Sequence, residues 1–345
     1  STAENCGRCH RAIYKAWKSS AHARSMESLL FQDALAAAEA QYGAQATRVC
    51  ISCHAPLAAP AADLAFQKKA TWEGVTCDYC HAVREVSFQA PNPRARLEFG
   101  LVKSGPLKDV SSSAHGAVFS EVHTSSTICA PCHDYRNPHG FDVLATYTEW
   151  KNSRYAKEGR NCQSCHMPPA SGPVADPRAA RSSGAQINLH AMPGAHSLDQ
   201  LTRTVKAQLT TARESGTLKV VLTVTNAGAG HYVPTGSPMR KIILEVAAQP
   251  YGGAALTERR TYERVVADAR GKPMALEYAA FIDAAKTLSD TRLAPDERRV
   301  ETFRFPIPDK TRVQLKVKFS YFYSPLGEPD SQMQVTFLTL QRLAP

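Results

Sequence analysis

The chain has 345 residues and a formal net charge of +10, from 41 Lys and Arg against 31 Asp and Glu. Taken alone, that excess suggests nucleic acid or an acidic membrane surface as a partner. No run approaches the roughly 18 to 20 apolar residues that cross a bilayer, so we expect no transmembrane segment. The ten cysteines and twelve histidines are the informative part of the composition, because both residue types ligate metals.

Every cysteine belongs to one of five copies of the pattern Cys-x-x-Cys-His. A lone Cys-x-x-Cys is often a redox pair or half of a zinc site, but neither requires a histidine after each pair. The repeated histidine indicates c-type haem, whose attachment signature is this pattern. The sequence therefore predicts five covalent haem c groups, with thioether bonds to the cysteines and the histidines as proximal iron ligands, and leaves no thiol for a disulfide. The motifs, numbered one to five in chain order, are Cys6, Cys9 and His10; Cys50, Cys53 and His54; Cys77, Cys80 and His81; Cys129, Cys132 and His133; and Cys162, Cys165 and His166.

The first predicted domain, residues 1–200, holds all the cysteines and eleven of the twelve histidines. Five haem groups on this stretch leave about 33 residues for each, too few for separate polypeptide cores, so the haem groups must share one core. The clearest helix is Met26–Tyr42, which ends before Gly43. Two stretches rich in Pro, Gly and Ser, Ala90–Ser113 and the arm Met167–Gly194, predict irregular chain ordered against porphyrin faces.

The second predicted domain, residues 201–345, changes to the period-two alternation of half-buried strands. About seven strands separated by turn signals predict an antiparallel β-sandwich resembling the immunoglobulin fold, without its cysteine pair. The fold class is thus a mostly α-helical and irregular pentahaem domain followed by a β-sandwich domain. The expected strands are Leu218–Thr225, Val313–Phe319, Met333–Phe337, Thr204–Thr211, Lys241–Ala247, Arg260–Ala267 and Arg299–Phe305.

Each haem iron has a second axial position, and seven histidines lie outside the motifs. A surplus histidine is ordinarily a solvated surface residue, but several of these crowd beside the motifs. The lone histidine of the second domain lies in the Gly- and Pro-rich loop Asn226–Gly236, which can project it towards a haem at the domain boundary or in a neighbouring subunit. We predict five distal iron ligands, namely His22, His115, His190, His196 and His231, and regard His123 and His139 as weaker candidates.

An internal echo indicates duplicated haem-binding units. Tyr14–Ala23 and Tyr147–Ala156 share Tyr, Trp, Lys, Ser and Ala in register. The second copy has Tyr155 where the first has His22. For Tyr155 we favour ordinary packing over a place facing an open iron.

These residues resemble a known family. Trp-x-x-Ser-x-His ending at His22, Ser-Ala-His-Gly around His115, and Glu-Trp-x-x-Ser before the fifth motif look like the multihaem cytochrome family that contains the tetrahaem electron acceptor of ammonia-oxidising bacteria. Gly-His-Tyr-Val-Pro-Thr-Gly, ending at Gly236, is similar to multihaem cytochromes of metal-respiring microbes with an appended sandwich domain. The resemblance, over most of residues 1–240, implies electron transfer through stacked bis-histidine haems and, in some relatives, assembly into conductive filaments. Five motifs instead of four, and Tyr155, depart from this pattern.

The charge of the predicted haem groups changes which partners we expect for the chain. An oxidised bis-histidine haem with two propionates carries about −1, so five bring the total to about +5 when oxidised and about zero when reduced. We therefore expect no nucleic-acid binding, and predict redox proteins or extracellular acceptors as partners, with self-association into a filament or oligomer.

Haem of this type is attached outside the cytoplasm, and a chain that starts at Ser1 without a signal segment looks like a mature exported form, periplasmic or extracellular. The function that we expect is electron transfer without catalysis. The alternative is an oxidoreductase acting on a nitrogen or sulfur oxyanion at one open-site haem, which would need an iron without a second protein ligand.

Overall fold

The structure is a computed structural model that describes residues 1–345 except 179, 182–185, 328–333 and 345. It divides into two compact units, one made of Ser1–Lys151 and Tyr155–Pro193, the other of Asn152–Arg154 and Gly194–Pro345. Within the described residues, no helix is both long and apolar enough to cross a membrane.

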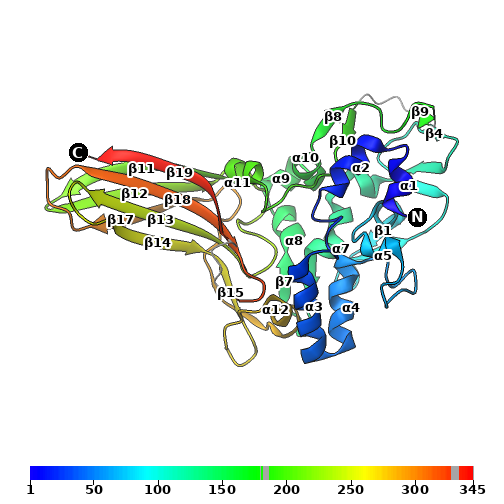
Figure 1. Cartoon of the computed structure of the whole chain (residues 1–345), viewed down its shortest axis with the longest axis horizontal. Coiled ribbons are helices and arrows are strands. Elements are labelled where there is room, and N and C mark those ends of the chain that lie inside the picture. Colours follow the sequence, from blue (N-terminus) through cyan, green and yellow to red (C-terminus); the bar gives the residue numbers. More distant parts are fainter. Residues whose placement is uncertain (179, 182–185, 328–333, 345) are drawn as a thin grey trace. The chain divides into compact units, whose positions relative to one another are not determined.

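The first unit consists of short helices joined by long connections (Figure 1). Two helices meet at Gly43, which has a φ of 75°, and the second of them contains the second motif. The first of them is α3 (Leu29–Tyr42), and it begins three residues later than we predicted because the Ser28 side chain caps it by accepting the Phe31 N–H. The predicted end at Gly43 is confirmed. The other helices of the unit are α1 (Ala3–Gly7), α2 (Arg11–Lys18), α4 (Ala44–His54), α5 (Lys69–Trp72), α6 (Cys77–Cys80), α7 (Ala130–His133), α8 (Thr146–Lys151), α9 (Arg154–Lys157) and α10 (Cys162–His166), with 3₁₀ turns Glu121–Thr124 and Ser126–Cys129.

Short strand pairs replace much of the irregular chain that we expected in this unit. Ala90–Ser113 contains β2 (Arg94–Leu97), β3 (Val102–Gly105) and β4 (Ser111–Ser112), so the irregular prediction was wrong there. Of these three, only β4 pairs with a strand far along the chain, and each has at most four residues, so its alternation does not stand out in the sequence. Parts of the predicted arm, residues 179 and 182–185, lie outside the described residues. The remaining strands are β1 (Val83–Ser87), β5 (Gly116–Phe119), β6 (Asp134–Arg136), β7 (Asp142–Ala145), β8 (Pro169–Ser171), β9 (Ala180–Arg181) and β10 (Gln186–Asn188), paired as β1 with β2, β3 with β5, β4 with β9, β6 with β7 and β8 with β10.

Apolar packing in the first unit is sparse. Its described clusters are small: one joins Met26, Ile51, Ala55 and Ala58, and another joins Ala3, Trp17 and Ala23. Large apolar side chains remain outside them, with Leu29 79% and Leu101 80% exposed. Clusters of this size do not offset the conformational entropy of so long a chain. The polypeptide of this unit therefore needs a further apolar component.

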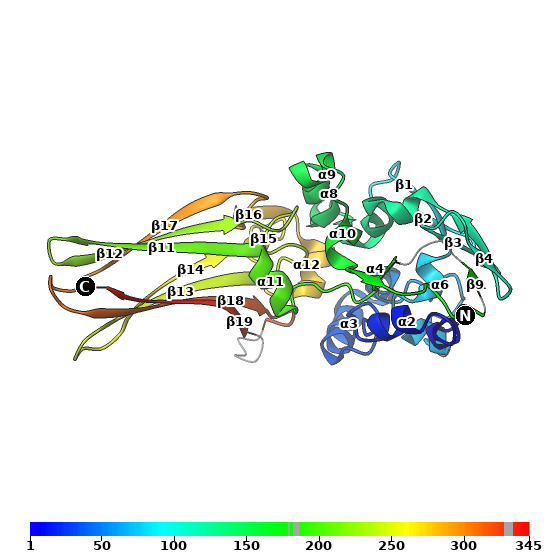
Figure 2. The same cartoon turned by 90° about the horizontal axis from the view of Figure 1, so that it is seen from above.

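The second unit is built on two antiparallel sheets (Figures 1 and 2). One has the order β11-β12-β17, and the other has the order β14-β13-β18-β19. Both contribute to one large buried core, which contains Leu222 and Phe303 from the first sheet and Leu244 and Phe319 from the second. The strands are β11 (Val205–Glu214), β12 (Thr217–Asn226), β13 (Arg240–Pro250), β14 (Leu256–Tyr262), β17 (Arg298–Phe305), β18 (Val313–Tyr323) and β19 (Gln334–Ala344), accompanied by the pair β15 (Arg264–Ala267) and β16 (Lys286–Asp290) and by helices α11 (Leu198–Thr204) and α12 (Glu277–Asp283).

Each strand predicted here coincides with an observed strand, apart from two differences. The stretch Arg260–Ala267 is split between β14 and β15, and Met333 lies outside the described residues. Alternation is visible because one side chain in two is buried, as in β12. Strand β16 was missed because its side chains are all exposed. Helix α11, which spans the predicted domain boundary, belongs to the second unit because Leu201 is part of its core.

The core predicts a clear contrast between two leucines of the second unit. Leu244 is fully buried on the central strand β13, whereas Leu343 on β19 is 67% exposed. We expect Leu244→Ala to lower the free energy of unfolding by about 2–5 kcal/mol, through lost burial and the cavity left behind. The matched variant Leu343→Ala should change it by less than about 0.5 kcal/mol. Calorimetric melting of the full chain measures both, and equal losses would contradict this placement of Leu244.

Candidate haem-attachment sites

Each Cys-x-x-Cys-His motif lies at a helical turn, and the turn explains the spacing. The second motif ends α4, the third begins with α6, the fourth ends with α7, the fifth forms α10, and the first begins within α1. Residues three and four apart share one face of a helix. Both cysteines and the histidine of a motif can therefore approach one planar group from the same side.

The proximal histidines are oriented by backbone carbonyl groups from distant parts of the chain. A carbonyl oxygen only accepts hydrogen bonds, so the imidazole Nδ1 must carry the proton, and the Nε2 lone pair of a neutral ring is left for a metal. Metal-bound histidines are commonly oriented in this way. The Nδ1 atom lies 2.7 Å from the Val174 oxygen in His10, 3.3 Å from that of Ser25 in His54, 2.6 Å from that of Ser104 in His81, and 2.6 Å from that of Pro193 in His166.

Three predicted distal histidines lie opposite proximal ones. The ring centres are 6.1 Å apart for His10 and His115, 6.1 Å for His133 and His22, and 6.4 Å for His81 and His190. Two imidazoles that bind one metal ion from opposite sides have ring centres about 6 Å apart, since each metal–nitrogen bond is about 2 Å long. These separations fit one iron between each pair.

The distal histidines use their Nδ1 atoms as the proximal ones do. His115 donates to the Gly116 carbonyl at 2.9 Å, and His190 donates to the Asn188 carbonyl at 2.8 Å. His22 differs, because its Nδ1 contacts the thioether sulfur of Met192.

Burial keeps two of these rings neutral. It lowers the pKa of His22 to about 4, with a further contribution from the positive fields of His54 and His166. Burial, followed by the field of His81, also lowers the pKa of His190 to about 4. A neutral imidazole is the form that binds a metal, so both rings are ready to ligate at pH 7.

The other two predicted distal ligands belong to the second unit. The ring of His196 contacts Tyr321 and Tyr323, with centres 6.0 and 6.4 Å apart. His231 Nδ1 lies 2.9 Å from the Tyr232 carbonyl, so its Nε2 has the same availability as in the proximal histidines. For both residues iron ligation stays a prediction.

The weaker candidate His123 illustrates the opposite arrangement. Its ring lies 5.5 Å from that of His81, but its Nε2 lies 2.9 Å from the Cys80 carbonyl. That nitrogen must donate to the carbonyl and has no lone pair for iron. Among the described residues, the buried Nδ1 of His123 has no hydrogen-bond partner and keeps the lone pair of the ring. His123 would therefore face a metal through Nδ1, whereas His190 presents Nε2 as the proximal histidines do, and we assign the position opposite His81 to His190. The second weaker candidate, His139, is exposed.

Thiol groups of different motifs contact one another. Cys6 hydrogen-bonds Cys77, Cys53 hydrogen-bonds Cys132, and Cys129 hydrogen-bonds Cys162. The first motif thus adjoins the third, while the second and the fifth both adjoin the fourth. The third and fourth are joined by Tyr79, whose side chain hydrogen-bonds Cys132. These cysteines would therefore hold neighbouring groups, in a branched order of motifs.

The internal echo has the same side-chain contacts in both copies. Trp17 Nε1 donates to a backbone carbonyl at 2.9 Å, and Trp150 Nε1 does so at 2.8 Å. In each copy the preceding tyrosine packs on the tryptophan, with ring centres 5.9 Å apart for Tyr14 and Trp17 and 5.6 Å apart for Tyr147 and Trp150. The matched geometry supports a duplicated unit.

The two copies also agree in burial and differ at one position. Ser20 and Ser153 are both buried. Where the first copy has His22, the second has Tyr155, which is 2% exposed and lies under the Arg160 guanidinium at 4.4 Å. These contacts agree with packing as the role of Tyr155.

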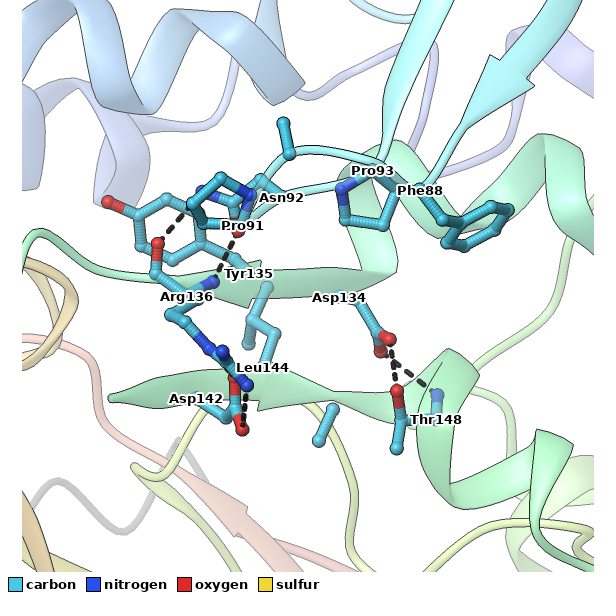
Figure 3. A pocket seen from close by; sticks show the side chains of 12 residues that line it. Phe88, Pro91, Asn92, Pro93, Asp134, Tyr135, Arg136, Asp142, Leu144 and Thr148 are labelled. Atoms are coloured by element: carbon cyan, nitrogen blue, oxygen red, sulfur yellow. Dashed lines mark hydrogen bonds and ion pairs between the residues drawn. The ribbon is translucent and has the colours of Figure 1, made fainter. Parts of the chain in front are cut away.

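A cavity of about 200 Å³ lies beside the fourth motif (Figure 3). Asp134, the residue after His133, accepts hydrogen bonds from the backbone N–H and the hydroxyl of Thr148 at 3.1 and 2.5 Å. Across the cavity, Arg136 Nε donates to Asp142 at 2.7 Å. These hydrogen bonds pair Asp134 with Thr148 and Arg136 with Asp142. They tie the fourth motif to β7 and α8, and they leave these groups paired within the protein instead of facing a ligand.

Sequence reasoning missed the side chains and carbonyls that orient the histidines. Phe31 stacks on His54, with ring centres 4.0 Å apart and planes at 6°. Met192 contacts His22, and it has a φ of 43°, which is rare for a residue with a side chain. The carbonyl acceptors belong to the backbone, so no residue type marks their positions in the sequence. The unusual backbone of Met192 lies within the predicted arm and was likewise invisible in composition.

Comparisons with known proteins agree with this geometry. The family described as cytochrome c554 and c-prime matches residues 5–82, which contain the first three motifs. No curated protein matches the sequence. The structure is similar to that of a pentahaem cytochrome c552 from Thermochromatium tepidum, with a TM-score of 0.79 and 21% identity, over 100% of this chain and 99% of that one. A protein described as the putative ApaA protein from Bordetella pertussis has a TM-score of only 0.22 at 12% identity, over 40% of this chain and 89% of that one, too low for a shared fold.

The two informative similarities concern different extents of the chain. The c554 match covers a minor part of the chain, and the c552 structure shares its fold. Together with the motif geometry they support a multihaem c-type cytochrome.

A pair of histidine variants tests the choice of ligand opposite His81. We expect His190→Ala to remove a nitrogen ligand from one iron, so that one ferric centre becomes high-spin. The matched variant His123→Ala should leave every centre unchanged, because we assign the position opposite His81 to His190 and not to His123. Low-temperature electron paramagnetic resonance of the oxidised protein measures both. A new high-spin signal in His123→Ala, with none in His190→Ala, would reverse the assignment.

Proposed function

We propose that this chain is an electron-transfer cytochrome with five covalent haem c groups held between paired imidazoles. When bound, haem iron supplies one-electron redox chemistry, with a potential set by its ligands and surroundings. The protein's part is to fix ligand geometry, to exclude water and to set the spacing between neighbouring groups.

The observation that carries the proposal is the separation of three histidine pairs, whose ring centres are 6.1, 6.1 and 6.4 Å apart. Two imidazoles on one iron leave no position for a substrate, which favours electron transfer over catalysis. The Nδ1 bonds hold the rings in place whichever the oxidation state, so little has to move when an electron arrives.

The contacts between motifs support a route for electrons through the first unit. In this proposal the groups follow one another as first, third and fourth, with the second and fifth as branches from the fourth. Tyr79 and the thiols of Cys77 and Cys132 lie along that route. The sequence order of the motifs is therefore not the order of transfer.

The second unit is proposed to be an antiparallel sandwich with a scaffold or docking role. Support comes from the single core shared by its two sheets. Export, redox proteins or extracellular acceptors as partners, and self-association into a filament remain part of the proposal. His196 and His231 are the proposed remaining distal ligands.

Spin state tests the proposed function against the alternative oxyanion reductase. If paired imidazoles occupy every iron, electron paramagnetic resonance of the oxidised wild-type protein should give low-spin ferric signals alone. Adding nitrite or hydroxylamine should change nothing, because no axial position is open. A stoichiometric high-spin signal that shifts with either compound would favour the reductase.

The proposed ligand His231 of the second unit has its own test. His231→Ala should convert one low-spin iron to high-spin, as expected when a distal nitrogen is lost. Its control is His139→Ala, the exposed weaker candidate, which should leave all signals as in the wild type. Unchanged low-spin signals in both variants would remove His231 from the ligand set.

Self-association is tested by negative-stain microscopy of the purified protein over a range of concentrations. Polymers that lengthen with concentration are expected for a filament subunit, because a contact that does not close repeats. Monomers alone at the highest concentration would contradict this part of the proposal.

A further inference from the structure

Met192 and the residue after it contact histidines of two different motifs within the first unit. The thioether sulfur of Met192 contacts the Nδ1 of His22, which lies opposite the proximal histidine of the fourth motif. The carbonyl oxygen of Pro193 lies 2.6 Å from the Nδ1 of His166 in the fifth motif. One short segment therefore orients an imidazole at each of two motifs, which also adjoin each other through their thiols.

The backbone conformation of Met192 is unusual for its position. Its φ is 43°, a value that few residues with a side chain adopt. A residue that precedes proline is restricted further, to extended conformations with negative φ. A rare conformation persists only where the surrounding contacts fix it. Here the contacts are those with the two imidazole rings, so the backbone serves the placement of Met192 and Pro193 beside them.

The main chain of His22 is fixed independently of its ring. The Val75 N–H donates to the His22 carbonyl at 3.0 Å. Gly74, with a φ of 65°, packs so closely that an added Cβ would lie 2.5 Å from the same carbonyl oxygen. The freedom that remains is rotation of the side chain, and the sulfur of Met192 lies against the nitrogen that would move. Met192 therefore sets the direction of the ring plane.

A sulfur partner makes His22 a weaker iron ligand. A thioether is a weak hydrogen-bond acceptor, whereas a backbone carbonyl is a strong one. A strong acceptor at Nδ1 raises the basicity of a metal-bound imidazole. A less basic ligand stabilises ferric iron less, so the reduction potential is higher. The predicted ligands of the first and third motifs have carbonyl oxygens at Nδ1 instead, namely His10, His115, His81 and His190.

The angle between the ring planes of His22 and His133 is a second difference. The planes cross at 63°, compared with 32° for the pair at the first motif and 24° for the pair at the third. Near-parallel rings act on the same iron d orbital and split it from its partner, while rings nearer a right angle leave the two orbitals close in energy. The ferric ion has one electron too few to fill this orbital pair, so the splitting stabilises the ferric ion alone. The crossed planes at the fourth motif therefore also favour a higher potential.

We propose that Met192 is a positioning residue that gives the haem of the fourth motif a higher reduction potential than those of the first and third. The weak acceptor and the crossed planes act in the same direction, because each stabilises the ferric state less. The inference rests on the proposed function and deepens it. One electron that leaves a ferrous iron at the third motif would reduce the ferric iron at the fourth, where the branches from the second and fifth motifs meet. The fourth motif is thus the collecting point of the proposed route.

The order of potentials is tested on the full chain, purified with its cofactors and poised at a series of potentials, by low-temperature electron paramagnetic resonance. His22→Ala identifies the signal of the fourth motif, because loss of this ligand replaces one low-spin signal by a high-spin one. In the wild type that signal should be strongly anisotropic. It should also disappear at a higher potential than the signals that His115→Ala and His190→Ala remove. Disappearance at the same potential as either of them, or at a lower one, would overturn the inference.

Variants of Met192 separate tuning of the ligand from simple packing. Met192→Gln keeps an unbranched side chain and replaces the sulfur by a strong acceptor oxygen. At a fixed potential it should shift the fourth motif towards ferric iron by about tenfold, which is about 59 mV for one electron. Met192→Leu removes the sulfur without supplying an acceptor, so it should not lower this potential. Equal shifts in both variants, or a shift in neither, would overturn the inference.

Two controls confine the effect to one centre. The signals of the first and third motifs should keep their potentials in both Met192 variants. Met274→Gln makes the same substitution at a half-buried methionine of the second unit, and it should change no potential. A shift of every potential in Met192→Gln would indicate a general disturbance of the first unit and would contradict a role at one ligand.

Failure of this inference is distinguishable from failure of the proposed function. If the purified chain carries no haem, both fail. If the chain carries low-spin haem and Met192→Gln leaves the potential of the fourth motif unchanged, the inference alone is overturned and the paired imidazoles stand. If His22→Ala produces no high-spin signal, His22 is not an iron ligand and the inference is overturned as well.

Discussion

Orientation of imidazole rings by backbone carbonyls is the interaction on which the first unit depends. An imidazole can present Nε2 to a metal only if its other nitrogen has somewhere to place its proton. Val174, Ser104 and Pro193 supply that acceptor for His10, His81 and His166 from positions far away in the chain. The long connections of this unit, with their small strand pairs, therefore have a physical purpose. They carry carbonyl groups to the rings and hold opposite histidines at the spacing of two metal bonds.

The two units solve the problem of stability differently. The second unit buries alternate side chains of long strands in one continuous core, which includes Val220, Leu244 and Phe319. The first unit has only small apolar clusters among its described residues, and it leaves Leu29 and Leu101 exposed. Porphyrin faces would supply the apolar surface that its side chains do not. On this account, folding of the first unit and attachment of the cofactor are one process, whereas the second unit holds together by itself.

Local sequence patterns predicted much of this arrangement. The elements and contacts that they missed are very short strands and pairings between distant parts of the chain. Helix α3 was expected because its composition and Gly43 act locally, and β12 and β18 were expected because alternation records burial on one face. The strands within Ala90–Ser113 were missed because each has at most four residues, too few for alternation to stand out among Pro, Gly and Ser, and because the partner of β4 lies far along the chain. In the site, the motifs alone predict the proximal histidines. For the position opposite His81, the coordinates show that His190 presents Nε2 and His123 presents Nδ1, because a carbonyl takes the other nitrogen of each ring. No sequence pattern records that difference.

The central claim is that covalent porphyrins complete the first unit, and the mass of the intact polypeptide tests it most directly. Mass spectrometry of the denatured protein, purified from a host that attaches c-type haem, should give the chain mass plus five additions of about 0.6 kDa each, because all ten cysteines lie in attachment motifs. Variants that lack both cysteines of one motif should lose one addition each. An unmodified polypeptide from the same host would contradict the account at its foundation.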